Sequence, residues 1–208
     1  MAKTLAAAVL VLMLCAFGTA HADLITNGDF LPYQTGGSGF TTISVPASVL
    51  SKAIPGWTVT AGSVDWIGSY WTAPGTGSID LDGNAQGAIK QILSTTAGQA
   101  YDVTFFLSAN PDGGPATKQV TVSAAGAPTL YSFTGSGNTH TNMGFIEESF
   151  LFTATGSNTA LTFASGTPGA YGAVIANVSA APVPIPATLL FFGPGLAGLV
   201  ALRKKFKI

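Results

Sequence analysis

Cysteine, histidine and charge are scarce in this sequence of 208 residues. The only cysteine, Cys15, lies inside an apolar run near the N-terminus, so the rest of the chain can form no disulfide and has no thiolate chemistry. Charged residues make up 8% of the chain, and residues 23–186 hold three lysines against nine acidic side chains, a net charge of −6. A region with so few basic residues has no electrostatic footprint for nucleic acid or acidic lipid.

Helical periodicity is also missing, because no stretch between residues 23 and 181 repeats apolar residues every 3.6 positions over three turns. Short segments of alternating polar and apolar residues stand there instead, separated by Gly and Pro about every 8 to 12 residues. Residues 31–56 are rich in Gly and Pro and are expected to be loop. The pattern predicts an all-β, antiparallel β-sandwich of the jelly-roll kind, with the last strand beside the first. The expected strands are residues 23–30, 57–60, 63–67, 78–83, 88–93, 100–109, 118–124, 129–134, 145–154, 159–163 and 173–178.

The N-terminus has the three parts of a secretory signal peptide in order. Lys3 gives a positive start, Leu5–Phe17 is apolar, and Ala20 and Ala22 form a small-residue cleavage site. We therefore expect a signal peptide over residues 1–22 and a mature chain that begins at Asp23.

The C-terminus, residues 182–208, combines a stiff spacer, an apolar run and a basic end. Three prolines hold residues 182–186 extended. Residues 187–202 would span about 24 Å as a helix, slightly short of a membrane core of about 30 Å, and Gly193-Pro194-Gly195 weakens that helix midway. The apolar run predicts a transmembrane helix, and the basic residues that follow it place the C-terminus in the cytoplasm by the positive-inside rule. The basic residues are Arg203, Lys204, Lys205 and Lys207.

This tail resembles the PEP-CTERM sorting signal of Gram-negative bacteria. The motif is Val183-Pro184-Ile185-Pro186-Ala187, a variant in which Ile185 stands where the commonest form has glutamate. The resemblance implies recognition by an exosortase-type enzyme, removal of the helix, and delivery to the cell surface or into exopolysaccharide. A permanent single-span anchor is the alternative.

The domain resembles the choice-of-anchor C family through segments such as residues 24–30, 54–59, 62–71, 78–83, 110–115 and 169–172. The resemblance implies a galactose-binding-like jelly roll over residues 23–181, a fold often used for carbohydrate recognition. Related sandwiches hold a structural calcium with acidic residues at two positions that are Leu31 and Ala176 here. No cofactor is therefore expected, although Asp29 leaves a weakened calcium site open.

Catalytic and metal motifs are not convincing. Asp80-Leu81-Asp82-Gly83-Asn84 starts like a calcium loop, but the required glutamate is replaced by Gln91, so Asp80 and Asp82 are expected on an exposed strand face. Glu147 and Glu148 are neighbours on a strand and point to opposite faces, unlike a glycosidase pair. His140 lies in a polar loop without a nucleophile elbow and is expected to be solvated. We predict no enzyme activity and no metal site.

The best functional signal is an aromatic cluster at a strand end and the loop that follows. Sugar rings stack on flat aromatic faces, and Asp or Asn side chains complete the hydrogen bonds. The candidate ligand contacts are Trp66, Tyr70, Trp71, Asp65 and Asn84. For Trp66, core packing beside Val64 is the alternative, and Trp57 is expected in the core. The prediction is a secreted, non-catalytic matrix protein that binds exopolysaccharide. A self-associating structural protein is the second possibility, and a glycoside hydrolase a distant third.

Overall fold

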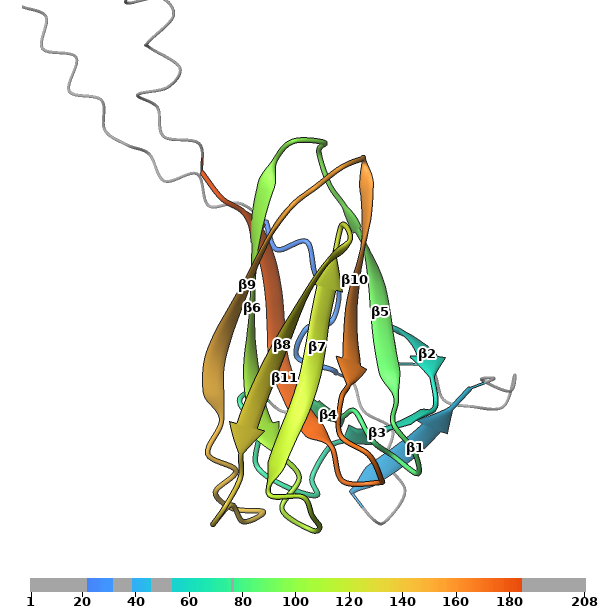
Figure 1. Ribbon diagram of the computed structural model, residues 1–208, viewed down its shortest axis with the longest axis vertical. Coiled ribbons are helices and arrows are strands. Elements are labelled where there is room, and N and C mark those ends of the chain that lie inside the picture. The colour runs from blue at the N-terminus through green and yellow to red at the C-terminus, as the bar shows by residue number, and fades with distance from the viewer. Residues whose placement is uncertain (1–21, 32–38, 46–53, 76, 185–208) are drawn as a thin grey trace, which may run out of the picture. The chain divides into compact units, whose positions relative to one another are not determined.

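The computed structural model describes residues 22–31, 39–45, 54–75 and 77–184 (Figure 1). These residues form eleven strands and no helix, which confirms the all-β prediction. No helix among them is long and apolar enough to cross a membrane. The predicted signal-peptide core, transmembrane helix and basic tail lie outside the described residues. The strands are β1 (Phe40–Ser44), β2 (Thr58–Ala61), β3 (Ser63–Ile67), β4 (Ser78–Asp80), β5 (Ala88–Ser94), β6 (Ala100–Ala109), β7 (Thr117–Ala124), β8 (Ala127–Thr134), β9 (Ile146–Thr153), β10 (Asn158–Ser165) and β11 (Ala173–Pro182).

The strands form two antiparallel sheets packed as a sandwich. One sheet has six strands in the order β1-β3-β4-β11-β6-β9, and the other has five in the order β2-β5-β10-β7-β8. Every paired neighbour is antiparallel. Figure 1 shows β8 and β7 crossing in front of β11, with β10 and β5 beside β7.

Strand β6 has the predicted bounds and the predicted inner face. Tyr101, Val103, Phe105 and Leu107 are buried, in alternation with half-buried neighbours. Such alternation is what a strand with one face on the core requires, since successive side chains point to opposite sides.

Two predictions near the N-terminus were wrong. Residues 23–30 form no strand: residues 26–29 bend and turn, and Asn27 and Phe30 adopt positive φ angles of 58° and 56° that interrupt a ladder. The segment still lies beside β11, as the amide of Leu24 donates to the carbonyl of Ala180 at 2.9 Å. Strand β1 falls in the region that was expected to be loop, where its Thr and Ile residues favour extended backbone.

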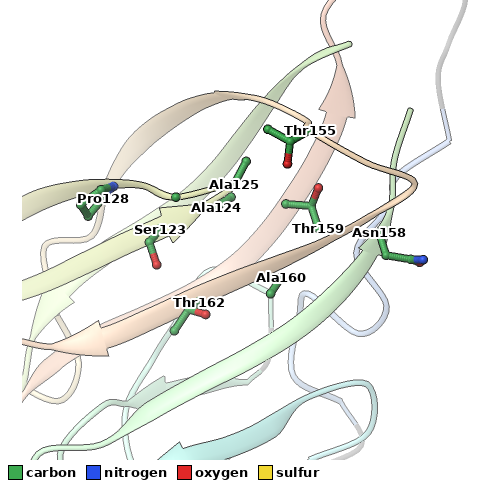
Figure 2. Close-up of a pocket in the computed structure, with 10 residues that line it drawn as sticks. Ser123, Ala124, Ala125, Pro128, Thr155, Asn158, Thr159, Ala160 and Thr162 are labelled. Atoms are coloured by element: carbon green, nitrogen blue, oxygen red, sulfur yellow. The ribbon is translucent and has the colours of Figure 1, made fainter. Parts of the chain in front are cut away.

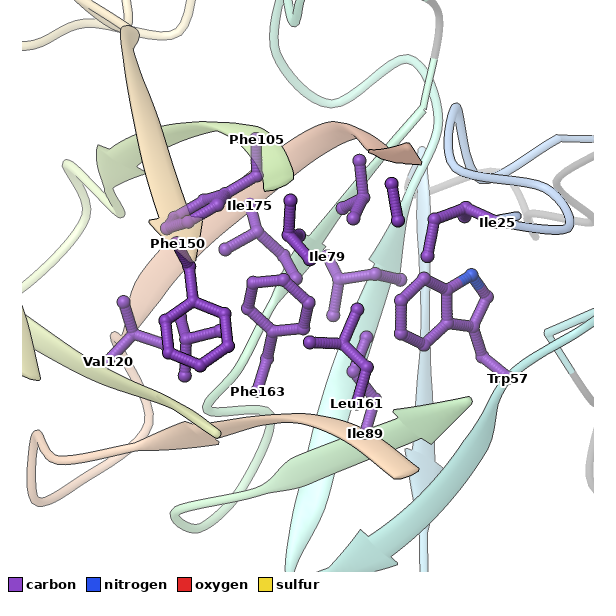
Figure 3. Packing of buried hydrophobic residues seen from close by; sticks show 14 of the residues in the cluster. Ile25, Trp57, Ile79, Ile89, Phe105, Val120, Phe150, Leu161, Phe163 and Ile175 are labelled. Carbon is purple, nitrogen blue, oxygen red and sulfur yellow. The ribbon is translucent and has the colours of Figure 1, made fainter. Parts of the chain in front are cut away.

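The core between the sheets is built around Phe163 of β10. Its ring is 5.2 Å from that of Phe105 and 6.1 Å from that of Trp57, both edge-to-face. Figure 3 shows Phe163 at the centre of the cluster, with Phe150 on one side and Trp57 on the other. The prediction that Trp57 is a core residue is confirmed, as it is 5% exposed.

A second, smaller apolar cluster lies on the outer face of the six-stranded sheet. On β3, Val64 and Trp66 belong to the main core, so Ile67 points to the opposite face. There it meets Trp71, Met143 and Val174, all buried. Connecting segments therefore cover part of this sheet face, and they build the walls of a cleft.

Candidate functional site

A cleft of about 310 Å³ opens beside this second cluster, at the lower end of the size range of ligand clefts. We call it the Asp65 cleft. Strands β1 and β3 form its floor, and the walls come from residues 68–75, 81–87, 110–116 and 166–172. Its lining residues are Phe40, Thr42, Asp65, Ile67, Tyr70, Trp71, Gly83, Asn84, Asn110, Asp112, Ala170 and Tyr171.

Four of the five predicted ligand contacts line the Asp65 cleft, namely Asp65, Tyr70, Trp71 and Asn84. The fifth, Trp66, does not, and this prediction is corrected. Trp66 is 2% exposed on the core side of β3, and its indole Nε1 donates to the carbonyl of Phe30 at 2.8 Å. The reason is strand parity, because Asp65 faces the cleft and its neighbour must face away.

The aromatic residues Tyr70 and Trp71 form a wall of the cleft rather than an open platform. Trp71 is 5% exposed, and its indole Nε1 donates to Ser78 Oγ at 2.9 Å. The ring of Tyr70 is packed at 4.6–5.5 Å from those of Phe40, Trp71 and His140. These rings are therefore held by their neighbours before any ligand arrives.

The most exposed ring in the cleft is Tyr171, which the sequence analysis did not single out. Tyr171 is 42% exposed, and its ring covers Gly113 so closely that an added Cβ there would lie 2.1 Å from Tyr171 Cδ2. One face of the ring is thus fixed against backbone. A tyrosine flanked by glycine in Gly169-Ala170-Tyr171-Gly172 is the signal that could have identified it.

His140 and Asp112 are bound to each other beside the cleft. His140 Nε2 lies 2.6 Å from Asp112 Oδ1, and the His140 side chain is 39% exposed. His140 was expected to be a solvated loop residue, yet it packs on Tyr70 and its carbonyl accepts from the amide of Thr72 at 2.9 Å. Asp112 was also missed by the sequence analysis. Through these contacts the pair links the connection that carries Tyr70 and Thr72 to the connections that carry Asp112 and His140.

Asp80 lies buried behind the cleft, which corrects the prediction of an exposed side chain. Its Oδ2 accepts from Asn110 Nδ2 at 2.5 Å, and its Oδ1 accepts from the amides of Asp82 and Gly172 at 2.9 and 3.0 Å. Burial raises the pKa of Asp80 to about 8; the hydrogen bonds from Asn110 and Asp82 act against that rise. These bonds tie together the two connections that carry Asp112 and Tyr171.

Asp82 and Lys118 are two further buried polar residues nearby. Asp82 is fully buried, and its two carboxylate oxygens have no hydrogen bond of normal geometry to another described residue. Burial raises its pKa, while the nearby Ser165 hydroxyl, Gly87 amide and Lys118 ammonium act in the other direction. Lys118 is 1% exposed and donates to the carbonyl of Gly113 at 2.7 Å, so it holds the backbone on which Tyr171 rests.

Metal ligation has no clear candidate in the part of the chain that the structure describes, where no group of three or more His, Cys, Asp or Glu could hold an ion.

Asp65 has a raised pKa because burial outweighs its hydrogen bond from the Thr42 hydroxyl. The cleft therefore offers carboxylate and amide groups for hydrogen bonding, together with ring faces.

A larger but chemically plainer hollow of about 550 Å³ lies on the other sheet. Figure 2 shows its lining on β7, β8, β10 and the turns beside them. The lining consists of Ser, Thr, Ala, Gly, Pro and Asn, without an aromatic or charged side chain. Ligand sites combine apolar or aromatic walls with a few placed polar groups, so the Asp65 cleft is the stronger candidate.

Comparison with known proteins identifies a matching family and several similar solved structures. The model of the DUF642 family, described as a protein of unknown function, matches residues 23–181. Halomucin of Haloquadratum walsbyi (strain DSM 16790 / HBSQ001) is 31% identical over 199 residues, which cover 86% of this chain and 2% of halomucin. The chain thus spans a small fraction of that curated relative.

Solved structures similar to this one include three carbohydrate-binding modules. A CBM4 module has a TM-score of 0.45 at 13% identity, covering 76% of this chain and 99% of its own. The CBM22-1 xylan-binding domain of Paenibacillus barcinonensis has a TM-score of 0.44 at 14% identity, covering 70% and 94%. A CBM61 module in complex with β-1,4-galactotriose has a TM-score of 0.43 at 10% identity, covering 78% and 99%. At these values no residue role is transferred from them.

Proposed function

This chain belongs to the DUF642 family, and we propose that it is a secreted, non-catalytic glycan-binding protein that holds a sugar in the Asp65 cleft. The observation that carries the proposal is the placement of Tyr171. Its exposed ring is backed by Gly113 and lines the same cleft as Asp65, Asn84 and Asp112.

The chemistry of a sugar fits these groups. One face of a pyranose ring carries C–H groups that pack on an aromatic face, while its hydroxyls need hydrogen-bond partners. Carboxylates accept hydrogen bonds from hydroxyls, and the Asn84 amide can both donate and accept. Because the Asn84 side chain makes no recorded bond to another described residue, it is free to meet a ligand. The fixed rings of Tyr70 and Trp71 reduce the entropy lost on binding.

Export and sorting are the second part of the proposal. The three-part signal peptide over residues 1–22 supports secretion. The Val183-Pro184-Ile185-Pro186-Ala187 motif, apolar run and basic end support handling by an exosortase-type enzyme and delivery to the cell surface or extracellular matrix. In this proposal the C-terminal helix lies in the membrane only until the enzyme removes it. Exopolysaccharide is the proposed ligand.

The test is isothermal titration of the secreted protein with exopolysaccharide from the producing organism. Saturable heat is expected for the wild type. A bound sugar would bury the exposed Tyr171 ring, and burying an aromatic side chain is worth about 1.5–3 kcal/mol, so Tyr171→Ala should weaken binding by about tenfold or more. Asn84→Ala and Asn158→Ala provide a matched pair, since both residues are exposed but only Asn84 lines the Asp65 cleft. Absence of saturable heat, or equal effects of the two Asn variants, would overturn the proposal.

Catalysis is tested in the same experiment. Asp65 and Asp112 share the cleft, and a carboxylate pair is the machinery of glycoside hydrolases. Because Asp112 is engaged by His140, we propose binding without turnover. New reducing ends in the titrated sample, lost in Asp65→Asn, would favour a hydrolase instead.

Self-association is favoured by a separate observation at the sheet edges. Strands β8 and β9 end their respective sheets, and they carry Leu130 at 57% and Leu151 at 65% exposure. Exposed apolar edge strands can pair with a second copy. Concentration-dependent assembly in sedimentation velocity, abolished by Leu130→Lys, would support a structural role.

A further inference from the structure

In the part of the chain that the structure describes, the lining of the Asp65 cleft has an excess of acidic side chains. Asp65 and Asp112 line it, and none of its lining residues is a lysine or arginine. The residues that the structure describes contain two lysines, Lys90 and Lys118. Lys118 is buried and directed to the carbonyl of Gly113, and Lys90 is on β5 of the other sheet, opposite Thr58 and Thr162.

A third acidic side chain, Asp80, lies behind the cleft but adds no negative charge to it at neutral pH. Asp80 is the cross-strand neighbour of Asp65 and is fully buried, and burial raises its pKa to about 8, so it stays protonated at neutral pH. It is joined to the cleft lining through Asn110. His140 borders the cleft through Tyr70, but its Nε2 already lies 2.6 Å from Asp112 Oδ1. A protonated His140 would therefore compensate Asp112 rather than attract a ligand anion.

We infer that the Asp65 cleft selects uncharged sugars and rejects acidic ones. This inference rests on the proposed glycan-binding function and narrows its ligand class. Hydroxyl groups donate strong, charge-assisted hydrogen bonds to carboxylates such as Asp65 and Asp112. A uronic acid, pyruvate ketal or sulfate would instead place a like charge beside them in a partly desolvated site, where repulsion is stronger than in water.

The experiment compares neutral hexa-oligosaccharides with the same backbones oxidised to the acid at C6. The probes are β-1,4-glucan, β-1,4-mannan and β-1,4-galactan hexaoses, titrated into the full secreted protein at low ionic strength. We expect at least one neutral probe to bind, and its acidic counterpart to bind about tenfold or more weakly. Added salt should reduce the difference in affinity between the neutral and acidic probes, because it screens the repulsion.

Asp65→Asn tests the origin of the selectivity. The variant should gain affinity for the acidic probe while losing some for the neutral one. Asp102→Asn is the matched control, since Asp102 also accepts a hydrogen bond from a hydroxyl, that of Ser149, but does not line the cleft. It should leave both affinities unchanged.

The outcomes separate the two proposals. If no probe of either kind binds, and the native exopolysaccharide also gives no heat, glycan binding itself fails. If acidic probes bind as tightly as neutral ones, or if Asp65→Asn leaves their ratio unchanged, the charge selectivity is wrong while glycan binding stands. The comparison of probes on the wild type needs no variant, so it remains decisive even if Asp65→Asn does not fold.

Discussion

Tyr171 and Gly113 are in such close contact that position 113 has no room for a side chain. A Cβ there would lie 2.1 Å from Tyr171 Cδ2 and 2.4 Å from Cε2. The two residues come from different connections, one after β6 and one before β11. The exposed ring of the cleft therefore takes its position from a glycine 58 positions earlier in the sequence.

Gly113→Ala should displace the Tyr171 ring and weaken glycan binding about as much as Tyr171→Ala, by roughly tenfold. The physical reason is steric, because real Cβ atoms do not approach carbon atoms this closely. Isothermal titration measures the affinity. Gly114→Ala is the control: a Cβ at position 114 meets nothing within 4 Å, so its affinity should match the wild type. Equal affinities for the two variants would contradict the assigned role of Tyr171.

Lys118→Met should lower the free energy of unfolding by about 1–3 kcal/mol, because it leaves the carbonyl of Gly113 without its buried donor and removes the positive charge nearest Asp82. Urea denaturation measures the change. In a double-mutant cycle with Asp82→Asn, the combined loss should be smaller than the sum of the two single losses. Strict additivity would show that the two buried groups do not interact.

Stability should fall as the pH rises from about 4 to about 8. The pKa of Asp80 is raised from 3.8 to about 8 by burial, so in this range the folded protein holds a proton that the unfolded chain releases. The stabilisation is complete below pH 3.8 and is lost as the pH passes through about 8. The raised pKa values of Asp65 and Asp82 act in the same direction. Urea midpoints at pH 5, 6.5 and 8 should therefore decrease, with a smaller decrease in Asp80→Asn. An unchanged slope in this variant would show that Asp80 is ionised in the folded protein.

Phe163→Ala should destabilise the domain by about 3–5 kcal/mol, because it opens a cavity between Phe105 and Trp57 in the centre of the core. Leu151→Ala, at a site that is 65% exposed, should change stability by less than about 0.5 kcal/mol. Both values come from chemical denaturation. A small effect of Phe163→Ala would mean that the sandwich core is not organised around β10.

The mature surface form should lack both ends of the chain. Intact mass spectrometry is expected to show a chain that begins at Asp23 and has lost residues Arg203 to Ile208. Replacing Pro184 and Pro186 with alanine should block this loss, since it removes the stiff spacer. A surface form that retains the basic end would instead indicate a permanent membrane anchor.

Local patterns in the sequence predicted the class of fold and much of the cleft. Alternation of polar and apolar residues identified strands such as β6, because one face of each sheet packs on the core. The same parity placed Asp65 opposite Val64. It could not decide whether Trp66 faced the core or a ligand, since both roles suit an aromatic residue.

The remaining features depend on contacts between distant segments. Asp80 and Asp82 alternate like an exposed strand face, but the connections at residues 110–116 and 166–172 cover that face. Tyr171 joins the cleft only because its loop packs on Gly113. No local periodicity contains this information. The turns at Asn27 and Phe30 could not be predicted from local patterns either. Phe30 has a positive φ angle and packs on Trp57, which is a contact between distant segments.

The most direct measurement is a map of backbone amide chemical shifts in the ¹⁵N-labelled protein during titration with the neutral hexaose that binds best. The sugar is expected to shift the amides of Gly83, Asn84, Asp112 and Tyr171, all in the Asp65 cleft, and to leave those of Ser123 and Ala160 on the opposite sheet unchanged. Shifts confined to the hollow at Ser123 and Ala160, or no saturable shift at the cleft, would contradict the assignment of the Asp65 cleft as the glycan site.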